Sequence, residues 1–338
     1  MKRTLSRLAR IAFTLLIVVM LVLFARTVDW AQTWGEIRNA SYGILAIAAL
    51  VNLASLVLKG LRWWIFLRPV GAESLWLAIR ATFAGAGLNN ILVANGGEAA
   101  RVIFVSRAAH IPSARVLATF ALERLFELIG YVVLLALALM FLSMPAEIAR
   151  FRPVAFGALL VVLGLLAYLI RHPEKAEVPA EIDAGWFDRL RAYGGRFLRT
   201  LTSISTVPRF AGALVLSVLV WALQLLTYHL TARAAHFPIT LVGSVAALIA
   251  VNLGFALRAT PGNVGVFQML YAVTAAAFGL DKDQAIAVAF LIQTQQILPV
   301  TALGVGLAPE FIFKRRRRPR PDNILPGEPV TESERSTA

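Results

Sequence analysis

The sequence predicts an all-α, polytopic integral membrane protein with about eight transmembrane helices, at least one re-entrant hairpin and a weak internal repeat. Of its 338 residues, 59% are hydrophobic and only 15% are charged, and the mean hydropathy is +0.73. The apolar residues form repeated runs near or above the ~20 residues that an α-helix needs to cross a bilayer. We therefore expect residues 1–313 to form one transmembrane domain.

The formal net charge of +14 does not point to a nucleic-acid partner. The basic residues lie in the tails and between apolar runs, where the positive-inside rule and anionic headgroups account for them. The absence of cysteine excludes disulfides, thiol nucleophiles and Cys-ligated metals. The four histidines show no metal-ligand spacing, so we expect no metal and no cofactor.

The first apolar run, Leu8 to Phe24, follows a basic N-terminal segment. No convincing signal-peptidase site follows it, so we expect a retained span with the N-terminus in the cytoplasm. A second run, Ile44 to Leu58, leads into the basic segment KGLRWWIFLRP. We expect this segment in the cytoplasmic headgroup layer, with its tryptophans as belt anchors rather than a ligand cage. The residues concerned are Lys59, Arg62, Trp63, Trp64 and Arg68.

Arginines lie on both sides of the next run, Leu75 to Ala94. If both of its ends face the cytoplasm, the run enters the membrane and returns as a re-entrant hairpin, broken around Gly85, Gly87 or Asn89-Asn90. Non-helical backbone at membrane depth is tolerated only against protein or a water-filled cavity. We therefore expect this hairpin to line a cavity.

Two more spans, Val116 to Leu142 and Val154 to Ile170, precede a polar loop over residues 171–208. Within this loop, apolar residues recur at helical spacing between Phe187 and Leu201, with arginines on the other faces. The pattern predicts a cytoplasmic amphipathic helix, which lies either on an anionic leaflet or against the bundle.

Four further runs complete the membrane domain: Phe210 to Thr231, Ile239 to Leu257, Val264 to Leu280 and Ala285 to Leu307. The tail that follows is strongly basic and belongs in the cytoplasm by the positive-inside rule. Residues 314–338 should form this basic tail, and its Pro-, Glu-, Ser- and Thr-rich end should be disordered.

The segment from Asn252 to Gln268 has the same form as the segment that begins at Gly87. Each contains an apolar helix, a Gly-rich break and a new helix, and each is followed by a long span with a polar cluster about midway. A repeat of broken segments is typical of the central site of a transporter, with coincidence as the alternative.

Ionisable side chains interrupt the apolar sequence between residues 96 and 127. In hydrocarbon each costs roughly 2.5 to 3.5 kcal/mol on insertion scales, so they need partners or water. A helix that starts at Gly96-Gly97 would direct free N–H groups at an anion. Spacings of three and four residues place Glu98 with Arg101 on one face, and Glu127 with both Arg124 and Glu123 on another.

A second break contains Arg258, Pro261, Gly262 and Asn263. Two arginine-bearing helix starts that face one cavity would suit a phosphate headgroup, which arginine binds bidentately. The alternative is structural: the charges pair only with one another and hold the bundle together.

Three motifs in order carry a resemblance to a known family: Gly96, Gly97, Glu98 and Arg101; Glu123, Arg124 and Glu127; Pro261, Gly262, Asn263 and Gly265. From Leu53 to Gly306 the chain resembles the flippase-like family that shares the transmembrane region of lysylphosphatidylglycerol synthase, together with its stand-alone UPF0104-like members.

The chain also departs from the family pattern. Ala94-Asn95 replaces the usual proline before the first motif, Asn263 replaces a glycine and Gln268 replaces an acidic residue. The last long helix offers glutamines where an arginine is common. The departures indicate a less charged second half and leave open a different substrate.

The resemblance implies that the protein binds an anionic, polyprenyl-phosphate or hopanoid-type lipid and moves it across the bacterial cytoplasmic membrane, with both termini in the cytoplasm. No aminoacyl-transferase domain follows residue 313, so no lysyl transfer is expected. In this hypothesis Arg101, Arg124 and Arg258 contact the headgroup. Glu98, Glu123 and Glu127 position the arginines, and Gly96, Gly97, Pro261, Gly262 and Asn263 form the helix breaks.

No Walker A motif is present, so movement would be passive or coupled to an ion gradient. The alternatives are a non-catalytic scaffold for envelope-biosynthesis enzymes and an intramembrane lipid-modifying enzyme. A homodimer also fits the sequence.

Overall fold

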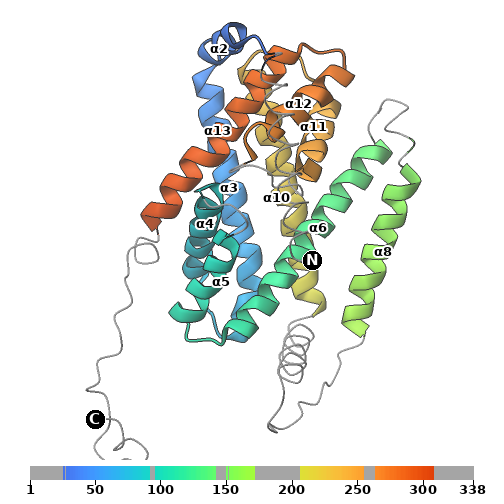
Figure 1. Ribbon diagram of the computed structural model, residues 1–338. Helices are drawn as coiled ribbons and strands as arrows, with labels where there is room; N and C mark the ends of the chain where they lie inside the picture. The colour runs from blue at the N-terminus through green and yellow to red at the C-terminus, as the bar shows by residue number, and fades with distance from the viewer. Residues whose placement is uncertain are drawn as a thin grey trace, which may run out of the picture.

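The computed structural model describes residues 26, 28–91, 96–141, 150, 152–171, 206–254 and 263–307, in which helices occur and strands do not (Figure 1). The prediction of an all-α fold is confirmed. The helices are α2 (Trp30–Arg38), α3 (Tyr42–Leu67), η1 (Arg68–Val70), α4 (Leu75–Ile91), α5 (Gly96–Ala108), α6 (Ser113–Phe141), α8 (Arg152–Arg171), α10 (Val207–Ala234), α11 (Leu241–Gly254), α12 (Val266–Ala277) and α13 (Lys282–Leu307).

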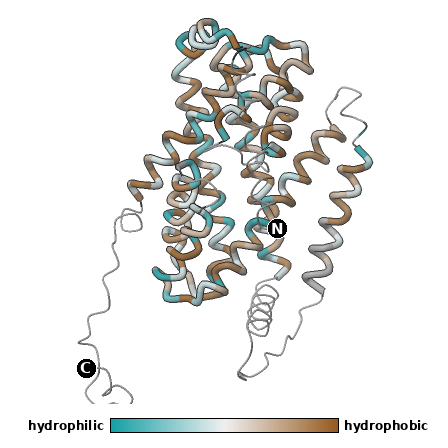
Figure 2. Tube along the Cα trace, viewed as in Figure 1, coloured by the Kyte–Doolittle hydropathy of each residue, from teal (hydrophilic) through white to brown (hydrophobic). Residues whose placement is uncertain are grey.

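Among the described residues, four helices are long and apolar enough to cross a membrane: Tyr42–Val70, Ser113–Phe141, Val207–Ala234 and Lys282–Leu307. Most of the described residues of α6 and α8 are hydrophobic (Figure 2). Large apolar side chains on these two helices are exposed, including Phe141 at 75% and Val161 at 72%. This surface is suited to lipid, and the chain is a polytopic helical membrane protein. The predicted first span, loop helix and tail lie outside the described residues.

Helix α3 extends nine residues beyond the predicted end of its span at Leu58. Arg62 and Trp63 are fully buried in it, so their assignment to the headgroup layer was wrong. Arg62 finds its hydrogen-bond partners inside the bundle, which replaces what headgroups and water would have supplied. Trp64 lies nearer the end of α3 and donates from Nε1 to the carbonyl of Glu73 (2.7 Å).

Helices α4 and α5 form the arms of a hairpin, but the break differs from the one expected. Helix α4 runs unbroken through Gly85, Gly87 and Asn89-Asn90, and the two arms are separated by residues 92–95. The glycines serve packing, since a Cβ on Gly97 would clash with the carbonyl oxygen of Gly85. Leu67, Ala72 and Ile111 share one core cluster. Both ends of the hairpin therefore lie at the same end of the bundle, as a re-entrant hairpin requires.

The predicted spans Ile239 to Leu257 and Val264 to Leu280 were wrong, because the helices found there, α11 and α12, are too short to cross a membrane. They contain 14 and 12 residues, which is about 21 and 18 Å at a rise of 1.5 Å per residue, short of the ~30 Å hydrocarbon core. Phe237 before α11 and Ala285 after α12 belong to one cluster. The two helices are thus the arms of a second hairpin. Replacing two spans by a hairpin leaves the orientation of every other span unchanged.

The two halves of the chain have the same plan in opposite orientations. In each half a long helix, two short helices and a second long helix follow one another, as α3 to α6 and as α10 to α13. Helices α3 and α10 are antiparallel, because Ser41 before α3 bonds to Ala234 at the end of α10 (2.7 Å). The hairpins α4–α5 and α11–α12 lie toward opposite ends of the bundle (Figure 1). This is the inverted repeat that many transporters use.

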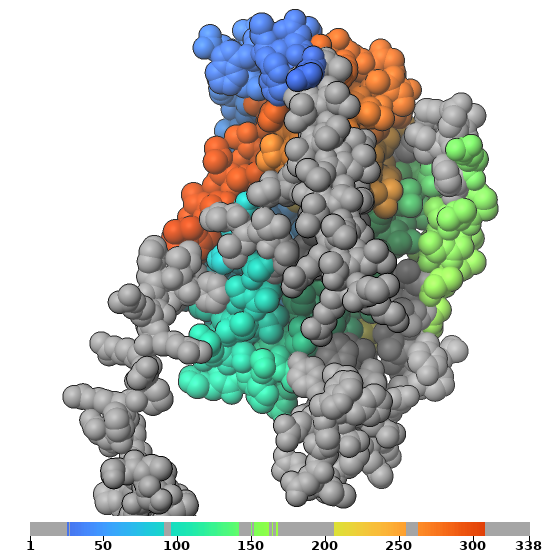
Figure 3. All heavy atoms as spheres, in the orientation of Figure 1, coloured from blue at the N-terminus to red at the C-terminus, as the bar shows by residue number. Residues whose placement is uncertain are grey.

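One end of the bundle is covered by α2, next to the start of α13 (Figure 3). Asp29 caps α2 by accepting hydrogen bonds from the amides of Ala31 and Gln32. The side chain of Gln32 then donates to Asp281 before α13 (3.4 Å). These bonds tie the beginning of the described chain to its last helix.

Candidate functional site

Seven charged side chains from three helices meet where α3, α5 and α6 pack together. We call them the ionic cluster. Its members are Lys59 and Arg62 of α3, Glu98 and Arg101 of α5, and Glu123, Arg124 and Glu127 of α6. The first two motifs of the sequence are therefore brought together, and the basic end of α3 joins them.

Glu123 is the centre of the buried half of the cluster. Its carboxylate accepts from Arg62 of α3 (3.3 Å) and from Arg101 of α5. The three side chains are at most 6% exposed, and Arg62 also donates to the hydroxyl of Ser217 on α10 (2.9 Å). One carboxylate thus joins three helices, in the manner expected of buried charges that satisfy one another.

Aromatic rings hold the guanidinium of Arg101 on its other side. Its Cζ lies 4.0 Å from the ring centroid of Trp63 and 5.0 Å from that of Phe120, within the range of cation–π attraction. The Trp63 ring is itself fixed by a hydrogen bond from Nε1 to Thr119 (3.1 Å). Arg101 is therefore held in place by a carboxylate and a tryptophan together.

The other half of the cluster is open. Here Lys59 pairs with Glu127 (3.2 Å), Glu127 with Arg124 (2.6 Å), and Arg124 with Glu98 (3.0 Å). The Arg124 side chain is 39% exposed and that of Lys59 is 26% exposed. The predicted pairing of Arg124 with Glu127 is confirmed, whereas Glu98 pairs across helices with Arg124. A ligand that reaches the cluster meets Arg124 and Lys59 first.

The cluster carries an excess of cations and of hydrogen-bond donors. Four cations against three carboxylates leave a net charge of +1. The Nε atoms of Arg62, Arg101 and Arg124 are buried, and none has a hydrogen-bond partner among the described residues. Buried donors are rarely left in this state, because the lost hydrogen bond costs about 1 to 3 kcal/mol. The cluster therefore has a net positive charge, and three of its arginines have an Nε donor without an acceptor in the part of the chain that the structure describes.

Helix α5 begins at Gly96, as the motif predicted. One of its first amides is already used, since Gly97 N–H donates to Oδ1 of Asn89 on α4 (2.9 Å). Asn89 therefore acts as a cap for α5 that comes from the neighbouring arm. Glu98 in the first turn of α5 has the charge that a helix N-terminus favours.

The second break is described only in part. Arg258, Pro261 and Gly262 lie outside the described residues, whereas Asn263 is 6% exposed and has a φ of 55°. Asparagine tolerates this left-handed conformation better than other non-glycine residues. The conformation explains in physical terms why asparagine stands where the resembled family has glycine.

Two glutamines of the second half, Gln268 and Gln293, bind each other. Gln268 Nε2 donates to Gln293 Oε1 (2.6 Å), and Gln268 Oε1 accepts from the amide of Gly265 at the start of α12 (2.6 Å). Both glutamines are at most 5% exposed. In place of charges, the second half therefore has a neutral, buried amide pair at its helix break.

Lys59 and Arg62 were missed as site residues, although the sequence contained a signal for them. Asn52, Ser55, Lys59 and Arg62 are spaced by three, four and three residues, which places them on one face of a helix. That face packs against α10, where Gln224 donates to Asn52 (3.3 Å) and to Ser55 (2.7 Å). A polar face that continues into a basic segment indicates a single buried helix.

Comparison with known proteins agrees with the motifs. The family model of the lysylphosphatidylglycerol synthase TM region matches residues 9–304. A protein of Haloferax volcanii named glycosyltransferase AglD is 24% identical over 340 aligned positions, which cover 90% of this chain and 54% of the relative. A UPF0104 membrane protein of Methanothermobacter thermautotrophicus is 25% identical over 283 positions, or 78% of this chain and 82% of the relative. The chain thus spans about half the length of the first relative. No solved structure gives a significant match.

Proposed function

Because the chain belongs to the family of the lysylphosphatidylglycerol synthase transmembrane region, we propose that it binds the phosphate-bearing headgroup of a membrane lipid in the ionic cluster and helps that lipid to cross the bilayer. The substrate class is a phospholipid or a polyprenyl phosphate, which share the phosphate. The proposal places the protein in the bacterial cytoplasmic membrane with both termini in the cytoplasm.

The observation that carries the proposal is the unused binding capacity of the cluster. Its net charge is +1, and three buried guanidinium Nε atoms have no acceptor among the described residues. A phosphate supplies both the negative charge and several acceptor oxygens, and arginine binds it with two parallel hydrogen bonds. Cluster and headgroup are therefore complementary in charge and in hydrogen bonding.

The order of contacts follows from exposure. The phosphate would first meet Arg124 and Lys59, the more exposed cations. Arg101 lies behind them, buried against Trp63. Since Glu98 of α5 competes for the same Arg124 guanidinium, a bound phosphate would weaken the link between α5 and α6. Loading of the site is thereby coupled to movement of the hairpin arm.

The buried half of the cluster favours a second candidate function. Arg62, Glu123 and Arg101 tie three helices together and need no ligand for that role. If the open half is also only structural, the protein is a scaffold in a lipid or cell-envelope pathway. The name of the Haloferax volcanii relative, a glycosyltransferase, suggests glycosyltransferases as partners for such a scaffold.

Transbilayer movement in proteoliposomes tests the proposal. Fluorescent phosphatidylglycerol and a labelled polyprenyl phosphate are reconstituted separately with native protein, Arg124→Gln, Lys59→Gln and the control Arg115→Gln. Arg115 is exposed and lies in the first turn of the same helix as Arg124, so the control removes an equal charge. We expect native protein and Arg115→Gln to move at least one lipid, and Arg124→Gln to slow this movement tenfold or more. Equal rates for all four proteins, or no movement of either lipid, would support the scaffold.

A further inference from the structure

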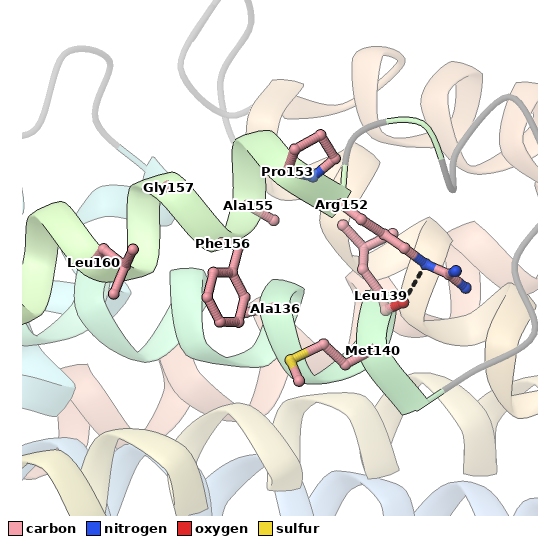
Figure 4. Close-up of a pocket in the computed structure, with 9 residues that line it drawn as sticks. All are labelled: Ala136, Leu139, Met140, Arg152, Pro153, Ala155, Phe156, Gly157 and Leu160. Atoms are coloured by element: carbon pink, nitrogen blue, oxygen red, sulfur yellow. Dashed lines mark hydrogen bonds between the residues drawn. The ribbon is translucent and has the colours of Figure 1, made fainter.

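A cavity of about 460 Å³ lies between the end of α6 and the start of α8, away from the ionic cluster (Figure 4). Ala136, the lining residue on α6 nearest the cluster, is nine positions beyond Glu127, which is about 13 Å along the helix. Eight of the nine lining residues are apolar: Ala136, Leu139, Met140, Pro153, Ala155, Phe156, Gly157 and Leu160.

The surroundings of the cavity are suited to hydrocarbon. The lining residues Met140 and Leu160 are 53% and 58% exposed, and Val154, which follows the lining residue Pro153, is 67% exposed. Water gains no hydrogen bonds in such a space, because a buried water needs two to four polar partners. The volume falls within the range of small-molecule sites, roughly 300 to 1,000 Å³. A lipid acyl chain is the molecule that a membrane supplies to fill it.

The ninth lining residue is Arg152, at the rim of the cavity. Its Nε donates to the carbonyl of Leu139 (2.7 Å), which lies in the last turn of α6. This bond fixes the side chain, and its two terminal nitrogens point past the end of α6 (Figure 4). Arg152 is exposed. A positioned guanidinium therefore lies where an acyl chain in the cavity would meet its headgroup.

We infer that this cavity, bounded by α6 and α8, is a binding site for an anionic phospholipid, with one acyl chain in the cavity and the phosphate on Arg152. Guanidinium and phosphate form charge-assisted, bidentate hydrogen bonds. Phosphatidylcholine carries the same phosphate, but its choline cation cancels the net charge of the headgroup and is repelled by the guanidinium. The site therefore prefers an anionic headgroup to a zwitterionic one of the same chain length. The site is separate from the ionic cluster and does not depend on lipid translocation.

Native mass spectrometry of the full chain in detergent tests this site, with dioleoyl phosphatidylglycerol as the probe and dioleoyl phosphatidylcholine as the comparison lipid. Gly157→Leu adds a large side chain at a lining position of the cavity, where a new Cβ would meet no other atom within 4 Å. Gly164→Leu on the same helix is the matched control. A new Cβ at position 164 also meets no atom within 4 Å, but Gly164 does not line the cavity. Arg152→Gln removes the guanidinium, with Arg115→Gln as the charge control.

We expect native protein and both controls to retain one phosphatidylglycerol at this site in preference to phosphatidylcholine, in addition to any lipid that the ionic cluster holds. Gly157→Leu should lose that molecule, and Arg152→Gln should raise its apparent Kd about tenfold or more. Gly157→Leu keeps the bond between Arg152 and Leu139, so it tests the site even if Arg152→Gln unfolds. Equal retention by native protein and Gly157→Leu would overturn the inference, as would equal retention of the two lipids by native protein.

Discussion

Arg101 lies against Trp63 with 4.0 Å between its Cζ and the ring centroid, while the same guanidinium is paired with Glu123. This relationship joins the re-entrant arm α5 to the long helices α3 and α6. In the membrane interior a guanidinium is tolerated only with such partners. The stability of the bundle should therefore depend on the buried half of the ionic cluster.

Glu123→Gln should destabilise the protein strongly. The substitution leaves Arg62 and Arg101 buried without a counter-charge, and breaking a buried pair from one side costs about 3 to 5 kcal/mol. We expect a clearly lower midpoint of thermal unfolding in detergent. Glu73→Gln, a loss of charge at an exposed position, is the control and should leave the midpoint unchanged. A midpoint for Glu123→Gln equal to that of the native protein would mean that the pairs are not coupled to folding.

Gly97→Ala should separate the arms of the first hairpin. Its Cβ would clash with the Gly85 carbonyl, which belongs to the backbone of α4 and cannot rotate away. We expect lower stability and increased protease cleavage between α4 and α5. Gly43→Ala in the first turn of α3 meets nothing within 4 Å, and it should be neutral or slightly stabilising because alanine favours helix. Similar behaviour of the two variants would argue against the close contact.

Much of this fold was predictable because hydropathy and charge are local properties of a chain. The long helices and the presence of a re-entrant hairpin followed from them, and the start of α5 followed from Gly96-Gly97. The hairpin itself is longer than predicted, because its arms are Leu75–Ile91 and Gly96–Ala108 and not two parts of the run Leu75 to Ala94. The exact break did not follow from the sequence, because a glycine that permits a close helix contact, such as Gly85, has the same sequence signal as one that ends a helix. The lengths of α11 and α12 were missed for a related reason, since an apolar run shows composition and not depth.

Five of the seven members of the ionic cluster were predicted from the sequence, but fewer of the pairs that they form. Spacing within α6 correctly paired Arg124 with Glu127. The bonds from Arg101 to Glu123 and from Glu98 to Arg124 cross between helices, so they depend on tertiary packing. Arg62 was assigned to the membrane surface because a basic, Trp-rich segment is typical of headgroup layers. Only the position of Glu123 and Ser217 beside it makes burial of Arg62 possible.

Position 263 should accept glycine and reject β-branched residues. Asn263 has a φ of 55°, where β-branched side chains are strained by roughly 1 to 2 kcal/mol. Asn263→Gly should keep the native unfolding midpoint, and Asn263→Val should lower it. Asn252→Val is the comparison, because Asn252 lies within helix α11, where its side chain donates to the carbonyl of Leu248 in the same helix. If valine is tolerated equally at both positions, the left-handed conformation is not required for the fold.

Asn52 and Pro299 should be energetically coupled. Pro299 lies inside α13 and has no N–H, so the carbonyl of Gln295 lacks its usual donor four residues later. Asn52 of α3 supplies the missing donor from Nδ2 at 3.3 Å. Asn52→Ala should therefore cost about 1 to 3 kcal/mol, as expected when a buried carbonyl loses its partner. In a Pro299→Ala background the restored N–H can bond to Gln295, so the same substitution should cost less.

A double-mutant cycle on chemical or thermal unfolding measures this coupling. Ser55→Ala is the control for the cycle, because Ser55 binds Gln224 and not the Gln295 carbonyl. Its cost should be the same with proline or alanine at position 299. If the cost of Asn52→Ala also stays constant, the proline does not create the need for the asparagine. A smaller cost in the alanine background would identify Asn52 as the residue that makes Pro299 tolerable inside α13.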